Sequence, residues 1–319
     1  MSGRTTILNT QTVSRISFAQ AQEAFFRHCK LKNLRKTTMI YYAENLRYFK
    51  SRVNIRYIDD ITQDVIGEFI LFELDSGKKS VSLNTRIRGL RVFFNFCVER
   101  DYLKPLSLKL MRTDEEIKEP YTKAELSKLL QRPKSNRWAE WRSWAVINYL
   151  LSTGNRAGTV INLHVDDIDF KNMTIHLRTV KNRKQQIVPL SPALSDALET
   201  YLKTWEWTPD NYLFPTNEGK QLQLRSLQSS VARYNISRGV TKTSVHLFRH
   251  TFAKDFILAG GGMAQLQFLL GHSTLEMTRH SIYFCVGALE SLIKATVPKN
   301  TSKNMEKSML YVVTLRSII

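Results

Sequence analysis

Hydrophobic positions in the first hundred residues recur with the period of an α-helix. Phe18, Ala21, Phe25 and Cys29 are spaced three or four apart, which places them on one helical face. The same spacing predicts three more helices, over residues 42–49, 65–72 and 87–98. Thr62 is a suitable N-cap for the third helix, and Ser82 or Asn84 for the fourth. Residues 16–102 therefore predict a domain of four helices, with no convincing strand.

The second half of the chain combines helical segments with a short alternating region. Apolar and polar residues alternate over 173–179, a turn follows at 182–183, and residues 186–190 predict a strand that pairs back. Helical patterns are predicted at 145–151, 191–205, 246–258 and 263–270. Thr122 and Glu125 have the spacing of a capping box. Tryptophans at 138, 141 and 144 favour core packing over base stacking. This half is expected to be mostly helical, with a small antiparallel β-sheet.

The region between these two patterns is the best candidate for a linker. It contains Pro105 and a mixed-charge run that ends at Pro120. We predict a flexible tail over residues 1–15 and a helical domain over residues 16–102. A linker over 103–119 then leads to a mixed domain over 120–297 and a C-terminal tail over 298–319.

Composition adds a strong positive charge that both domains share. The 319 residues carry a net charge of +19, with a pI of about 9.9. Residues 1–104 hold 18 basic and 10 acidic side chains, and residues 105–297 hold 25 and 17. Such a spread favours a long polyanion as partner. Lys36, Arg86, Arg88 and Arg91 are candidate DNA contacts in the first domain; the alternative is an ordinary solvated helix face.

Other features argue against several classes of protein. The three cysteines are far apart and show no metal-ligand spacing. No apolar run approaches the roughly 20 residues of a membrane span, and the N-terminus lacks the apolar core of a signal peptide. We therefore expect no metal and no membrane association, and a cytoplasmic location.

Three short motifs in the second domain carry candidate chemistry. They are Thr153-Gly154-Asn155-Arg156, His246-Leu247-Phe248-Arg249-His250 and Leu270-Gly271-His272. Arginine donates planar, permanently charged hydrogen bonds to phosphate oxygens, and histidine can bind the same oxygens or move a proton. His246 and Arg249 are one helical turn apart. A zinc site at His246 and His250 lacks the intervening glutamate and a third ligand.

The ordered motifs, with Asn211-Tyr212-Leu213-Phe214-Pro215, resemble the tyrosine recombinase (phage integrase) family, and within it the integrases of mobile elements. The resemblance covers roughly residues 16–295. It implies a mainly α fold, with a SAM-like core-binding domain followed by a mostly helical catalytic domain. It also implies catalytic roles for Arg156, Lys181, His246, Arg249 and His272. Lys181 on the hairpin would protonate the leaving 5′-oxygen, and Lys184 is the competing candidate.

The resemblance also implies a reaction and its partners. A tyrosine of the family attacks a DNA phosphate, forms a 3′-phosphotyrosyl bond and releases a 5′-hydroxyl, which later reverses the step. Because the covalent link conserves the bond energy, no cofactor is expected. The implied partners are double-stranded DNA, further copies of the chain in a homo-tetramer, and an accessory directionality factor.

One position departs from the family pattern. The nucleophilic tyrosine is expected at position 281, where this chain has Ser281. The nearest tyrosine is Tyr283, and two residues along a helix rotate a side chain by about 200°. Three alternatives stay open: a disabled recombinase, an irregular helix that lets Tyr283 serve, or attack by Ser281. The function classes are accordingly a strand-exchange enzyme and a non-catalytic DNA-binding protein of recombinase ancestry.

Overall fold

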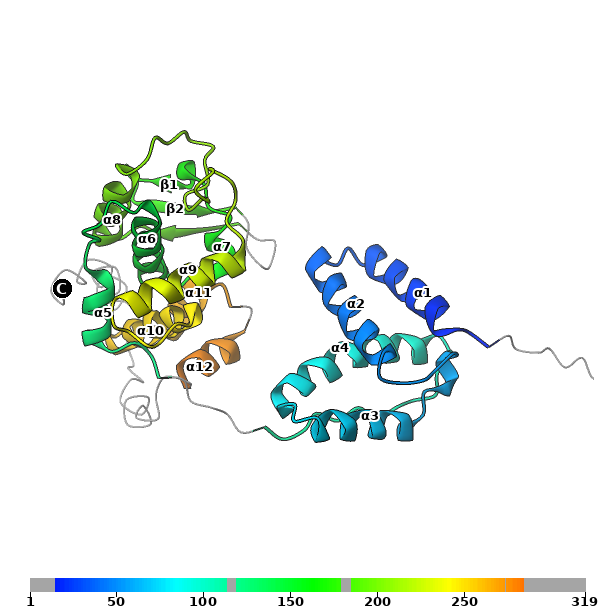
Figure 1. Cartoon of the computed structure of the whole chain (residues 1–319). Helices are drawn as coiled ribbons and strands as arrows, with labels where there is room; N and C mark the ends of the chain where they lie inside the picture. Colours follow the sequence, from blue (N-terminus) through cyan, green and yellow to red (C-terminus); the bar gives the residue numbers. More distant parts are fainter. Residues whose placement is uncertain (1–14, 114–118, 179–184, 273, 284–319) are drawn as a thin grey trace, which may run out of the picture. The chain divides into compact units, whose positions relative to one another are not determined.

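The chain folds into helices with one small β-sheet, as the sequence predicts (Figure 1). The computed structural model describes residues 15–113, 119–178, 185–272 and 274–283. Two compact units divide the chain between Glu115 and Glu116.

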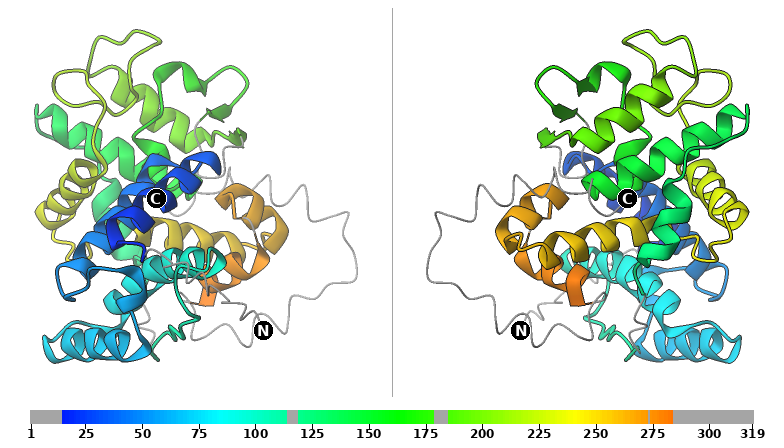
Figure 2. Two further views of the ribbon diagram at one scale, coloured as in Figure 1. Left: turned by 90° about the vertical axis from the view of Figure 1, so that its right-hand side faces the viewer. Right: turned by 90° about the vertical axis from the view of Figure 1, so that its left-hand side faces the viewer.

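Over residues 15–113 the first unit contains four α-helices and a short 3-10 helix, drawn in blue to cyan in Figures 1 and 2. They are α1 (Phe18–Leu31), α2 (Lys36–Lys50), η1 (Ile58–Asp60), α3 (Gln63–Asp75) and α4 (Ser80–Glu99). Thr62 caps α3, as predicted, by accepting a hydrogen bond from the backbone N–H of Val65. The predicted start of α4 is wrong. Lys79 is its extended N-cap residue, and Ser82 and Asn84 lie inside the helix.

Asn84 instead ties the end of this unit to α4. Its side chain exchanges two hydrogen bonds of 2.9 Å with the backbone of Met111. Leu103 and Leu108 are buried in the core of the first unit. Residues 103–111, the first part of the predicted linker, therefore pack against the first unit, whose ordered part extends past residue 102.

The second unit combines helices with a three-stranded antiparallel sheet. Its elements are α5 (Lys123–Leu130), α6 (Trp138–Thr153), α7 (Ala157–Val160), η2 (Val165–Asp167), β1 (Ile168–Asp169), β2 (Thr174–Leu177), β3 (Gln186–Pro189), α8 (Pro192–Leu202), α9 (Leu224–Ser237), α10 (Val245–Leu258), α11 (Met263–Leu270) and α12 (Leu275–Tyr283). The strand order is β1-β2-β3, with Ile175 opposite Val188. This is the predicted hairpin with one short strand added.

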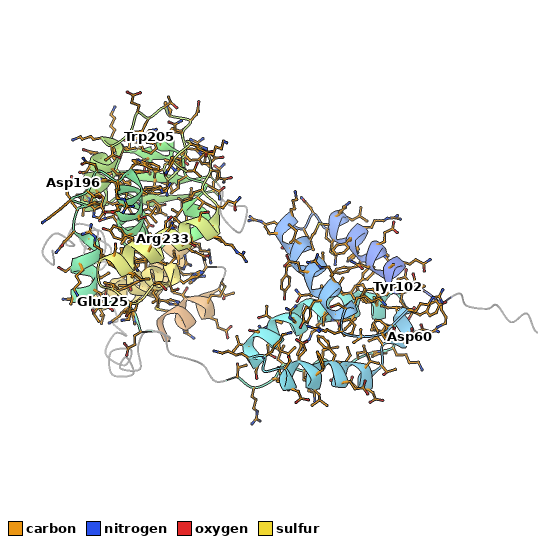
Figure 3. The ribbon with its side chains drawn as sticks, viewed as in Figure 1. Asp60, Tyr102, Glu125, Asp196, Trp205 and Arg233 are labelled. Carbon is orange, nitrogen blue, oxygen red and sulfur yellow. The ribbon has the colours of Figure 1, made fainter. Side chains whose placement is uncertain are left out.

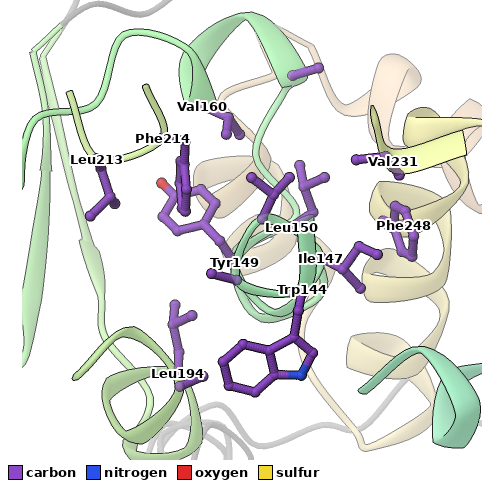
Figure 4. Packing of buried hydrophobic residues seen from close by; sticks show 14 of the residues in the cluster. Trp144, Ile147, Tyr149, Leu150, Val160, Leu194, Leu213, Phe214, Val231 and Phe248 are labelled. Carbon is purple, nitrogen blue, oxygen red and sulfur yellow. The ribbon is translucent and has the colours of Figure 1, made fainter. Parts of the chain in front are cut away.

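Helix α6 forms the centre of the second unit and packs against α5, α8, α9 and α10. Figure 4 shows it end-on, with Leu213 and Phe214 on one side and Val231 and Phe248 on the other. Trp144 is 2 % exposed, while the two neighbouring tryptophans of α6 pack partly buried against the same core. The packing interpretation of the tryptophans is confirmed.

The start of the second unit is fixed by contacts with α10 and the segment that precedes it. Tyr121 stacks on Phe248 with ring centroids 4.4 Å apart. Lys242 donates a 2.9 Å hydrogen bond to the carbonyl of Pro120 and lies 3.1 Å from Glu125, which Figure 3 labels at α5. Thr122 and Glu125 form the predicted capping box.

Within the described ranges no helix is long and apolar enough to cross a membrane. The same residues contain no group of histidine, cysteine and carboxylate side chains that could hold a metal ion.

Candidate phosphate-binding site

The corner that follows α6 positions Arg156. Gly154 ends α6 in the left-handed conformation at φ +61°, and an added Cβ would lie 2.3 Å from the ring of Phe252. Only glycine fits both conditions. The next residue, Asn155, is buried and donates a 2.8 Å hydrogen bond to the hydroxyl of Tyr149. Arg156, the N-cap residue of α7, therefore leaves the backbone from a rigid corner.

Arg249 links this corner to the end of α11. Its side chain projects from α10 and the residue is only 7 % exposed. Nη1 donates to the carbonyl of Gly154 and Nη2 to that of Leu270, both at 2.8 Å. Arg156 Nη1 lies 3.4 Å from the carbonyls of Leu270 and Gly271. The two guanidinium groups thus converge on the same turn of backbone.

His272 completes the group, just after the left-handed Gly271 that ends α11. Its Nε2 lies 2.6 Å from Nη2 of Arg249, and its Nδ1 lies 2.9 Å from Oγ1 of Thr278. A guanidinium can only donate, so Nε2 accepts. The ring proton then resides on Nδ1 and is donated to Thr278. That threonine is fully buried, and no sequence motif indicated its role.

The second hairpin strand reaches the same place. Gln186, the first residue of β3, donates a 2.6 Å hydrogen bond to the carbonyl of Phe268. A Cβ built on Gly271 would lie 3.3 Å from Oε1 of Gln186 and 3.9 Å from Nη1 of Arg156. Gln186, which no sequence motif indicated, secures the sheet to the end of α11.

Among the described residues no carboxylate balances the positive charge of this group. In the described part of the chain neither Arg156 nor Arg249 forms an ion pair; both donate to backbone carbonyls, and Arg249 also donates to His272. Burial and the nearby charge of Arg156 lower the pKa of Arg249 to about 9. Burial and both arginines lower the pKa of His272 to about 4, so the imidazole is neutral near pH 7. Such a group favours an anion.

The remaining predicted catalytic residues lie on α10, on α12 or outside the described residues. His246 lies in the first turn of α10 with an exposed side chain. Lys181 and its competitor Lys184 fall outside the described residues. The backbones of Ser281 and Tyr283 belong to α12, where Tyr283 is the last residue. The structure thus brings Arg156, Arg249 and His272 together.

The four predicted DNA contacts of the first unit differ in their surroundings. Lys36 and Arg88 are exposed. Arg86 stacks on the ring of Tyr48, with Cζ 3.6 Å from the centroid. Arg91 donates a hydrogen bond to the carbonyl of Leu108 and so helps to hold the segment after α4.

Comparison with known proteins assigns both units to one class. Residues 120–286 match the phage integrase family, and residues 23–101 match the N-terminal SAM-like domain of phage integrases. The chain therefore belongs to the phage integrase, or tyrosine recombinase, family. A tyrosine recombinase of Pseudothermotoga lettingae is 29% identical over 80% of this chain and 90% of its own length. The tyrosine recombinase XerD of Staphylococcus epidermidis is 26% identical over 78% of this chain and 88% of its own length.

Solved structures share the fold at lower identity. The Tn1549 transposon integrase, in complex with transposon right end DNA, has a TM-score of 0.72 and 21% identity, covering 88% of this chain and 98% of that one. A lambda integrase tetramer bound to a Holliday junction has a TM-score of 0.69 and 15% identity, covering 84% and 78%.

Proposed function

We propose that this chain is a site-specific recombinase of the tyrosine type that binds duplex DNA and holds one backbone phosphate between Arg156, Arg249 and His272. The unbalanced charge of these residues carries the proposal. A buried guanidinium without a carboxylate is costly unless an anion approaches it. The solved integrases that share the fold are DNA complexes, which supports a phosphodiester as that anion.

The geometry suits stabilisation of a pentacoordinate phosphate. Arg156 and Arg249 would donate to non-bridging oxygens as negative charge develops, which is usually the largest catalytic contribution. His272 is held with its proton on Nδ1 and Nε2 turned to Arg249. Protonated by the approach of a phosphate, it would donate to an oxygen through Nε2. Lys181 is proposed as the general acid for the 5′-oxygen, and His246 as a further phosphate ligand.

We further propose that Ser281 removes the covalent step while binding survives. Its hydroxyl is a far weaker acid than a phenol and is carried on a much shorter side chain. Tyr283 is two residues further along α12, a rotation of about 200° in a regular helix. Without an attacking tyrosine, the protein occupies recombination sites and does not cut them.

An adduct assay on a nicked suicide substrate tests this proposal. The unmodified chain should bind the duplex and form no covalent protein–DNA product, while Ser281→Tyr should form one. Adding Arg249→Gln to Ser281→Tyr should abolish the product, because the phosphate grip is lost. Tyr283→Phe in the Ser281→Tyr background should change nothing.

Two contrary outcomes would assign the attack to a residue of the unmodified chain, and a third would refute DNA binding. An adduct of the unmodified chain that Tyr283→Phe abolishes would assign the attack to Tyr283. An adduct that Ser281→Ala abolishes would assign the attack to Ser281. A chain that fails to bind DNA at low salt would refute the proposal as a whole.

The proposal extends to assembly and setting. The lambda integrase tetramer supports a homo-tetramer on DNA, which sedimentation of a DNA complex would test. A mobile element as the source, the cytoplasm as the place of action and an accessory directionality factor belong to the same proposal. The domains proposed to act on DNA are the core-binding domain, 16–102, and the catalytic domain, 120–297.

A further inference from the structure

The first unit contains a completely buried carboxylate. Glu73 on α3 is 0% exposed. The hydroxyl of Tyr48 donates to both of its oxygens, at 2.8 and 3.0 Å. Lys78 Nζ pairs with Oε2, and Arg52 Nε lies 3.9 Å from Oε1. The carboxylate therefore holds groups from the end of α2 and from the turn between α3 and α4.

The ring of Tyr48 gathers three cations around this carboxylate. Arg86 Cζ lies 3.6 Å from the ring centroid, Lys78 Nζ 4.3 Å and Arg52 Cζ 5.2 Å. These distances are within the range of cation–π attraction. We call Tyr48, Arg52, Glu73, Lys78 and Arg86 the Tyr48 cluster.

The Tyr48 cluster holds more positive charge than its one carboxylate can balance. Three cations and Glu73 leave a net charge of +2. Burial and the neighbouring Arg86 lower the pKa of Lys78, as expected for cations that repel one another. The side chains of Lys78 and Arg52 remain 30% and 42% exposed, while Glu73 is covered. The excess positive charge is therefore accessible from solvent, whereas the carboxylate of Glu73 that holds Lys78 is not.

We propose that the Tyr48 cluster binds a DNA backbone phosphate through Lys78, Arg86 and Arg52, and that Glu73 is a positioning residue that holds Lys78 and Tyr48 in place. A side chain fixed in advance loses less entropy when it meets a phosphate oxygen. Tyr48, whose hydroxyl is turned to Glu73, offers its ring face as a platform for the cations. This inference rests on the proposed DNA binding and adds a site to it.

Glu73→Gln in the full-length chain separates positioning from simple electrostatics. Glu68→Gln, which removes an exposed carboxylate from the same helix, is the matched control. If only net charge mattered, both variants should bind DNA slightly more tightly than the unmodified chain, because each loses one negative charge. If Glu73 positions Lys78, its variant should instead bind about tenfold more weakly, the value of one charge-assisted hydrogen bond.

The measurement is fluorescence anisotropy with a labelled duplex of mixed sequence over a range of salt concentrations. Each lost phosphate contact should reduce the slope of log K against log salt by about 0.9. A slope and affinity for Glu73→Gln equal to those of Glu68→Gln would overturn the inference while leaving the proposed function intact. Loss of DNA binding by the unmodified chain would overturn both.

A double-mutant cycle identifies the group through which Glu73 acts. Lys78→Met keeps the aliphatic stem and removes the charge. If Glu73 acts through Lys78, adding Glu73→Gln to Lys78→Met should weaken binding little further; full additivity would contradict the assignment. If Glu73→Gln unfolds the first unit, Lys78→Met alone tests the inference. Because the side chain of Lys78 is partly exposed, this variant should still fold. An unchanged salt slope for Lys78→Met overturns the inference.

Discussion

Replacing Gly154 with alanine tests how the corner before Arg156 is built. Two costs add at this position. The left-handed backbone at φ +61° costs alanine about 1 kcal/mol. The new Cβ would also lie 2.3 Å from the Phe252 ring and 2.9 Å from a methyl of Leu270, and such overpacking costs about 1–3 kcal/mol.

Gly239 provides the matched control in the same unit. Its φ is +69°, and a Cβ there would meet nothing within 4 Å. Gly239→Ala should therefore cost about 1 kcal/mol from backbone strain alone. Alanine also reduces the entropy of the unfolded chain, but equally in both variants. The expected difference is the steric part, about 1–3 kcal/mol.

Urea unfolding followed by tryptophan fluorescence measures that difference. All five tryptophans of the chain lie in the second unit, so their signal reports this unit alone. With a slope of about 2 kcal/mol/M, the Gly154→Ala midpoint should fall about 0.5–1.5 M below that of Gly239→Ala. Because Arg249 donates to the Gly154 carbonyl, Gly154→Ala should also bind DNA more weakly. Equal midpoints for the two variants would refute the close-packing argument.

Other predictions concern His272, Thr278 and Lys242. His272 should titrate near pH 4 by NMR and at higher pH with DNA bound. Because the unfolded imidazole titrates near 6.5, its stabilising contribution is complete above that pH and lost as the pH falls towards 4; an unchanged pKa on DNA would contradict phosphate contact. Thr278→Val should leave Nδ1–H without its acceptor and shift the Nδ1 resonance in ¹⁵N spectra, while Arg249 keeps the proton on Nδ1; Thr278→Ser should leave the resonance unchanged. Lys242→Met should destabilise the second unit by about 1–2 kcal/mol; Lys220→Met, which breaks an exposed pair, should have little effect.

The sequence by itself predicts most of the secondary structure, because the responsible interactions are local. Helical spacing identifies α1 through Phe18, Ala21 and Phe25, which are buried together. Caps act over three residues, so Thr62 and Thr122 correctly indicate where α3 and α5 begin. The start of α4 was misplaced because Asn84, a good local cap, pairs instead with Met111, 27 residues away.

The family resemblance, rather than residue patterning, singled out Arg156, Arg249 and His272. Each motif alone is compatible with an ordinary surface or core residue. The tertiary structure adds what makes them one group: both guanidinium groups meet the carbonyl of Leu270, and Arg249 sets the proton position on His272.

The partners of buried polar groups were decided only by the tertiary structure. Arg91 resembles any basic residue on a polar helix face, yet it donates to the carbonyl of Leu108, 17 residues away. Glu73 sits among the apolar residues of α3, and its partner Tyr48 is 25 residues distant. Periodicity and capping rules reach only a few residues along the chain. A buried carboxylate or guanidinium must be satisfied by whichever groups the packing of distant helices brings to it, and packing, not local sequence, determines them.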